Sequence, residues 1–159
     1  KVNRFNHDDI GWNYRMTNIQ ATLGISQLSR IKKIVKNRHS VGLQYYNKLK
    51  KNKNIFIPEP KKSFAKNIYW VVAVLIMNKN INLDAKKVTQ KLNKFGIGTR
   101  PFFWPMHKQK ILKNLKLQNS KLFANSEYIS KNGFYLPSSL SLKTSEIKYI
   151  CEKVNLILK

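Results

Sequence analysis

The stretch GWNYRMTNIQA, residues 11–21, holds a glycine, two polar side chains suited to ligand binding and the beginning of a helix. Thr17 is followed three residues later by Gln20, which is the spacing of a capping box. In a capping box the two side chains satisfy backbone N–H groups that the first helical turn leaves unpaired. The sequence therefore predicts that a helix begins near Asn18 and that a loop precedes it.

Asn13 and Arg15 lie in that loop, just before the predicted helix. An amide and a guanidinium close to a helix N-terminus suit a phosphate or a carboxylate. The same residues also fit a structural role, in which Asn13 caps a turn and Arg15 forms an ion pair within the protein. Spacing alone leaves both interpretations open.

The length of the chain, 159 residues with 42% apolar side chains, fits one globular unit. The chain opens at Lys1 within loop-like sequence, so we expect it to be part of a longer protein. The longest apolar run, residues 68–77, is too short to span a membrane. A single cysteine, Cys151, fits a reducing compartment. We therefore expect a cytoplasmic protein without membrane contact.

The formal net charge of +24 would suit a partner rich in phosphate, such as nucleic acid. However, only five of the 31 basic residues are arginine, which is the side chain preferred for forked phosphate and base contacts. The lysines are scattered along every segment, as is typical of solvated surfaces. We expect no specific nucleic-acid site.

The hydrophobic periodicity predicts an α+β organisation. Residues 1–17 form a loop, residues 18–51 one long helix with a bend near Gly42, and residues 52–159 a small domain. Within the small domain we expect a strand over residues 68–77 that is buried on much of both faces, and a helix that Asn82 caps and Gly96 ends. A third helix ends at Gly133 and precedes a brief strand. The last helix places Cys151 on its apolar face, as packing.

A second unusual stretch is GIGTRPFFWPMH, residues 96–107. Its two prolines prevent an interior strand from continuing, so we expect its aromatic side chains at a loop edge near a pocket. Aromatic rings beside arginine and histidine suit a flat or anionic ligand, although the rings could also close a core and His107 could be a surface histidine.

Conventional catalytic motifs are absent from the sequence. It has no glycine-rich phosphate loop and no serine nucleophile elbow, and its seven acidic residues are scattered. The three histidines, His7, His39 and His107, lack the spacing of metal ligands, so no metal site is predicted.

In five ordered blocks the chain resembles the C-terminal part of the DegT/StrS-type sugar-nucleotide aminotransferases, which are fold type I enzymes dependent on pyridoxal 5'-phosphate (PLP). The blocks lie in residues 7–21, 27–28, 68–70, 99–107 and 133–138. Within the family, the form RPFFWPMH at residues 100–107 is most similar to that of the perosamine synthases, which aminate a GDP-linked 4-keto-6-deoxy sugar. One departure is Gln109-Lys110, where relatives commonly have Gln-Pro, and it leaves substrate preference open.

The resemblance implies an α+β small domain with a long N-terminal helix and helices packed on a mostly antiparallel sheet. It also implies a homodimer with shared active sites, glutamate as amino donor and a nucleotide-linked 4-keto-6-deoxy sugar, for cell-surface polysaccharide synthesis. The lysine that holds the cofactor as a Schiff base belongs to the large domain, so this chain alone contains no catalytic residue and is expected to be inactive.

The resemblance further implies site residues. Asn13 and Arg15 would reach the phosphate region of the partner's PLP, in trans. The substrate would be bound by His7, Arg100, Phe102, Phe103, Trp104 and His107. A different reading is a truncated small domain without catalysis, acting as a basic binding module.

Overall fold

The first helix begins where the sequence predicts. In the computed structural model, which describes residues 5–78, 83–115 and 122–159, α1 spans Asn18–Leu28 and Thr17 is its N-cap. The Thr17 N–H donates to Oε1 of Gln20 at 2.8 Å, and the Gln20 N–H donates to the Thr17 hydroxyl oxygen at 3.3 Å. The predicted capping box is confirmed.

The segment predicted as one long helix is two helices, since α2 spans Ile31–Leu49. The Arg30 N–H donates to the Gln27 carbonyl oxygen at 3.0 Å, and the Ser29 hydroxyl donates to the Ser26 carbonyl oxygen at 2.8 Å. These short-range bonds tighten the last turn and compete with the regular helical pattern. The interruption therefore lies at Ser29 and Arg30, and not at the predicted bend near Gly42.

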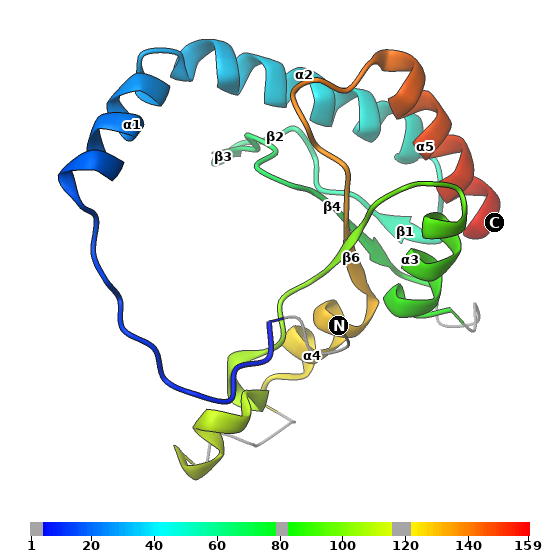
Figure 1. Cartoon of the computed structure of the whole chain (residues 1–159). Helices are drawn as coiled ribbons and strands as arrows, with labels where there is room; N and C mark the ends of the chain where they lie inside the picture. The colour runs from blue at the N-terminus through cyan, green and yellow to red at the C-terminus, as the bar shows by residue number, and fades with distance from the viewer. Residues whose placement is uncertain (1–4, 79–82, 116–121) are drawn as a thin grey trace.

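A four-stranded antiparallel sheet lies at the centre of the rest of the chain (Figure 1). Its order is β1 (Ile55–Phe56), β4 (Val72–Ile76), β6 (Gly133–Leu136) and β5 (Arg100–Pro101). A separate hairpin pairs β2 (Lys61–Lys62) with β3 (Ala65–Lys66). The remaining elements are α3 (Ala85–Lys94), the 3₁₀ helices η1 (Met106–Lys108) and η2 (Lys110–Leu115), α4 (Ala124–Asn132) and α5 (Thr144–Ile157). The predicted α+β class and antiparallel sheet are confirmed.

Strand β4 is shorter than the predicted strand over residues 68–77. Tyr69 has a φ of 51°, in the left-handed region that a strand cannot contain, so the segment before Val72 is irregular. Val72, Val74 and Ile76 are buried, whereas Ala73 and Leu75 are only half-buried. Strand β4 thus has one fully buried face, and its other face is only partly covered, which is less burial than predicted.

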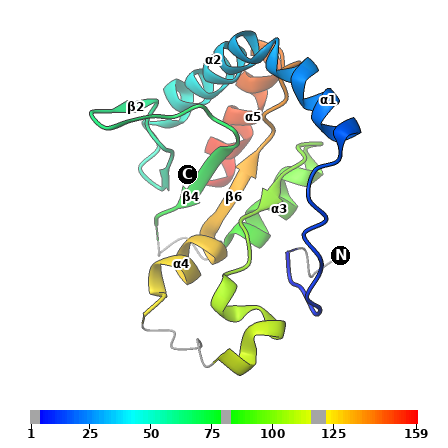
Figure 2. The same cartoon turned by 90° about the vertical axis from the view of Figure 1, so that its left-hand side faces the viewer.

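One hydrophobic core joins the sheet to helices α2, α3 and α5. Figure 2 shows α2 and α5 side by side above the sheet. Asp84 caps α3 by accepting the Lys87 N–H at 2.8 Å, and Gly96, with φ of 74°, follows its last turn as predicted. The predicted cap Asn82 lies outside the described residues. Helix α4 ends at Asn132 and β6 begins at Gly133, in agreement with the sequence pattern.

Cys151 lies in this core on the buried face of α5, as the periodicity predicts. Burial raises the pKa of its thiol to about 12. The thiol is therefore protonated near neutral pH and serves as packing, because the thiolate is the reactive form.

The segment from residue 9 to α1 extends away from the sheet (Figure 1). None of the residues of α1, all of which the structure describes, is buried. Large apolar side chains along this segment are exposed, including Trp12 and Tyr14 at 84% each. In the described part of the chain, no helix combines the length and apolar character needed to cross a membrane.

Candidate functional site

The predicted aromatic segment forms a ring cluster at the edge of the sheet. Phe102 stacks on Tyr135 of β6 with ring centres 4.6 Å apart, and Phe103 meets the same tyrosine edge-on at 6.3 Å. Phe5, from the N-terminal segment, lies 4.7 Å from Phe103. The register explains the arrangement, because edge strand β5 pairs Pro101 with Phe134 and Arg100 with Tyr135. Phe103 remains half exposed, as a ligand-facing ring would be.

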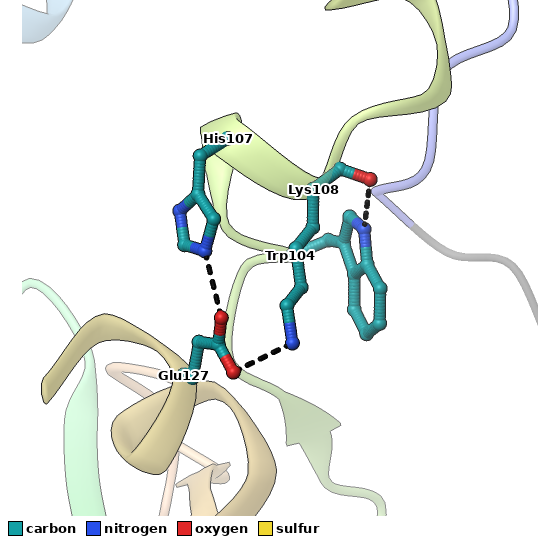
Figure 3. A network of polar contacts seen from close by, with 4 residues as sticks. All are labelled: Trp104, His107, Lys108 and Glu127. Atoms are coloured by element: carbon teal, nitrogen blue, oxygen red, sulfur yellow. Dashed lines mark hydrogen bonds and ion pairs between the residues drawn. The ribbon is translucent and has the colours of Figure 1, made fainter. Parts of the chain in front are cut away.

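A polar network follows the aromatic rings and joins η1 to α4 (Figure 3). His107 Nε2 lies 3.0 Å from Glu127 Oε1, and the Lys108 ammonium lies 2.7 Å from Glu127 Oε2. The Trp104 indole N–H donates to the Lys108 carbonyl oxygen at 3.0 Å. One carboxylate thus holds two neighbouring basic side chains, and the Trp104 ring is fixed to the same turn.

His107 is more enclosed than a surface histidine, with 6% of its side chain exposed. Its ring stacks on Phe123 with centres 4.5 Å apart, while Nε2 is engaged by Glu127. The surface alternative is therefore wrong. The predicted contact with a sugar or diphosphate stays a prediction and would have to use Nδ1.

Glu127→Gln tests the network through its pH dependence. The hydrogen bond from Lys108, and then that from His107, lowers the pKa of Glu127 from its ordinary 4.5. A lowered pKa in the folded state means that the carboxylate contributes stability above the ordinary value and loses it as the pH falls through the lowered pKa. We expect the wild type to have a higher Tm than Glu127→Gln near neutral pH. The difference between the two Tm values should shrink below about pH 4.5.

Thermal melts over this pH range check the expectation. Glu152→Gln is the control, because Glu152 pairs with Lys148 at 4.0 Å on an exposed helix face and such pairs contribute little. If the difference in Tm between the wild type and Glu127→Gln stays constant down to acid pH, the ionised carboxylate does not stabilise the turn.

Residues 5–8 lie against this same region. The Gln109 side chain donates from Nε2 to the Phe5 carbonyl oxygen at 2.7 Å and accepts the His7 N–H on Oε1 at 2.9 Å. The Lys110 ammonium lies 3.2 Å from Asp8. His7 itself is exposed. The structure therefore brings the backbone at His7 beside the segment that carries Phe103, Trp104 and His107.

Asn13 and Arg15 are exposed. They belong to the segment before α1, which extends away from the sheet (Figure 1). Asn13 Oδ1 accepts the Arg15 N–H at 3.3 Å, which is the turn-capping interpretation. Tyr14 and Arg15 have φ values of 56° and 44°, a left-handed pair that side-chain-bearing residues seldom adopt. Among residues 5–78, 83–115 and 122–159, Arg15 forms no ion pair, so the ion-pair interpretation lacks support within them.

The amide of Asn13 has a second group, Nδ2, and the turn leaves the guanidinium of Arg15 at the surface. The two interpretations of Asn13 are thus compatible, since its oxygen shapes the loop while its NH₂ group is a donor. Arg100 is also exposed, in β5.

Sequence reasoning did not identify Glu127, Tyr135, Phe5, Phe123 and Gln109 as parts of this region. Tyr135 belongs to a block that carried the resemblance, and Gln109 was singled out only as a departure. For Glu127 the residues near it in sequence give no signal, because its partners lie on another element.

Comparison with known proteins identifies the family. Residues 1–155 match the sequence profile of the DegT/DnrJ/EryC1/StrS aminotransferase family. The chain belongs to this family. GDP-perosamine synthase of Escherichia coli O157:H7 is 32% identical over 152 residues, which are 94% of this chain and 38% of that enzyme. GDP-perosamine synthase of Vibrio cholerae is 30% identical and covers 93% of this chain and 39% of the enzyme. This DegT-family chain thus spans about two-fifths of the length of these relatives.

Solved aminotransferases share the fold. Helicobacter pylori PseC, an aminotransferase involved in the biosynthesis of pseudoaminic acid, superposes with a TM-score of 0.77 and is 22% identical, covering 95% of this chain and 40% of PseC. The PLP form of the putative sugar aminotransferase Spr1654 from Streptococcus pneumoniae has a TM-score of 0.77 at 20% identity, covering 90% of this chain and 36% of Spr1654.

The residues of this DegT-family chain fit one part of the cofactor held by such relatives. The exposed Asn13 amide and Arg15 guanidinium form a donor set that suits a phosphate group. Asn13 and Arg15 are two positions apart, in the turn that precedes Thr17, the N-cap of α1.

Proposed function

We propose that this chain is the C-terminal part of a PLP-dependent nucleotide-sugar aminotransferase. Its substrate would be GDP-4-keto-6-deoxymannose, its amino donor glutamate, and its product the 4-amino sugar for cell-surface polysaccharide synthesis in the cytoplasm. The observation that carries the proposal is the 32% identity to a GDP-perosamine synthase over 94% of this chain. That match covers both the Asn13 loop and the aromatic segment.

The working enzyme is proposed to be a homodimer with shared active sites. The exposed apolar side chains of the segment before and within α1 form a surface suited to a protein contact, because soluble proteins seldom leave such a stretch in water. They are Ile10, Trp12, Tyr14, Met16, Ile19, Leu23, Ile25 and Leu28. The occupant would be a second copy, into whose site the Asn13 loop reaches.

Each predicted residue then has a proposed task. PLP, when bound, supplies the electron sink that lets an amino group pass between glutamate and a keto sugar. Asn13 would donate from Nδ2 to a phosphate oxygen, while Arg15 would balance the phosphate charge. Phe102, Phe103 and Trp104 would provide flat surfaces for the nucleotide sugar, and His7, Arg100 and His107 would supply polar contacts to the sugar or its diphosphate. Glu127 would keep the His107 ring in place.

The test is an amination assay on the enzyme that contains this chain, with PLP, glutamate and GDP-4-keto-6-deoxymannose. We expect a GDP-linked 4-amino sugar by mass spectrometry and an equal amount of 2-oxoglutarate. Amination of another 4-keto nucleotide sugar alone would overturn the substrate and keep the reaction class. Absence of amination with every keto sugar, together with salt-sensitive polyanion binding, would favour the basic binding module.

A further inference from the structure

Gln109 is one of the two buried polar residues in the described part of the chain, with 4% of its surface exposed. Both ends of its amide are used, since Nε2 donates to the Phe5 carbonyl oxygen at 2.7 Å and Oε1 accepts the His7 N–H at 2.9 Å. Only one orientation of the amide satisfies both bonds. The side chain therefore pairs with the backbone of residues 5–7 much as a neighbouring strand would.

The contact joins segments that are distant in the sequence, because 104 positions separate Gln109 from Phe5. Two further contacts lie beside it: the Phe5 ring against Phe103 at 4.7 Å, and Lys110 with Asp8 at 3.2 Å. Lys110 and Asp8 are more than half exposed, so their ion pair contributes little. The buried amide is thus the specific part of the junction, since polar groups buried without partners are costly.

We propose that Gln109 is a positioning residue for the shared active site. It holds the backbone at Phe5 and His7 against the aromatic segment, and so fixes where the His7 side chain and the following Asn13 loop are presented. This inference rests on the proposed function, because it assigns Gln109 to the same substrate region. Gln109 acts through residues 5–8 and touches no substrate.

The chain offers a matched pair of substitutions. Gln109→Met keeps the length and apolar stem of the side chain but removes both hydrogen bonds. Gln44→Met is the control, since Gln44 Oε1 is buried and has no hydrogen-bond partner among the described residues. In Gln109→Glu, an ionised carboxylate still accepts the His7 N–H but repels the Phe5 carbonyl, whereas a protonated carboxyl group restores the donor.

The first measurement is hydrogen exchange of the His7 amide in the enzyme that contains this chain. We expect exchange to accelerate about tenfold or more in Gln109→Met and to stay unchanged in Gln44→Met. The second measurement is steady-state kinetics, in which KM for the nucleotide sugar should rise about tenfold in Gln109→Met, and more than kcat falls. In Gln109→Glu, KM should also rise near neutral pH, because an ionised carboxylate cannot donate to the Phe5 carbonyl oxygen.

The outcomes separate the two proposals. Unchanged exchange in Gln109→Met overturns the inference, and so does accelerated exchange with unchanged KM. An inactive wild-type enzyme would instead contradict the proposed function, while the exchange measurement would still report whether Gln109 holds residues 5–7. If Gln109→Met does not fold, Gln109→Glu decides, and a KM equal to that of the wild type near neutral pH overturns the inference.

Discussion

Gly42→Ala is expected to destabilise the fold by about 2 kcal/mol or more, although alanine is the better helix former by about 1 kcal/mol. Gly42 is buried on α2, and a Cβ built there overlaps the ring of Tyr69. That ring has little freedom to move. Tyr69 is 2% exposed, its N–H donates to Asn67 Oδ1 at 2.8 Å, and its hydroxyl donates to the Pro58 carbonyl oxygen at 3.3 Å.

Gly24→Ala is the matched control, because Gly24 lies in α1 and a Cβ there meets no atom of the described residues within 4 Å. We expect this variant to be neutral or slightly more stable. Urea unfolding of both variants gives the comparison. Equal free energies of unfolding for the two variants would show that Tyr69 does not pack against Gly42.

Asn13→Asp is expected to weaken cofactor retention about 100-fold in the enzyme that contains this chain. Aspartate keeps the Oδ1 acceptor for the Arg15 N–H, so it preserves the turn. It removes the Nδ2 donor and sets a negative charge against the phosphate. If Asn13 only caps a turn, the substitution should therefore be silent, and if Asn13 holds the phosphate, it should be harmful.

Equilibrium dialysis followed by PLP quantification measures retention. Asn18→Asp is the control, since it makes the same charge change in the first turn of α1, where an acidic residue is favourable. Retention equal in Asn13→Asp and the wild type would remove Asn13 from the cofactor site.

Local signals predicted much of the fold. Thr17 with Gln20, Gly96 after α3 and the apolar stripe of α5 each depend on residues a few positions apart, which a sequence displays directly. The run at residues 68–77 predicted too long a strand. The backbone of Tyr69 is left-handed and its ring packs against Gly42 of α2, and sequence spacing does not show such a contact between elements. The interruption at Ser29 and Arg30 was missed because one helical period continues across it.

The candidate site shows the same division. Asn13, Phe102, Phe103, Trp104 and His107 stand out in two short stretches of sequence. The residues that hold this region together do not stand out in the sequence. Glu127 contacts His107 from another helix, and Gln109 contacts Phe5 across 104 positions. Spacing rules describe neighbours along one element, so contacts made by folding lie outside their reach.

The central claim is that the Asn13 loop completes the active site of a second subunit, and mixed dimers test it most directly. One subunit carries Asn13→Asp, and the other carries a substitution of the cofactor-binding lysine in the longer enzyme. If Asn13 acts in trans, each mixed dimer contains one site with an intact lysine and an intact Asn13. We therefore predict that mixing two nearly inactive proteins restores aminotransferase activity well above their sum. Activity no higher than that sum in verified mixed dimers would contradict the account.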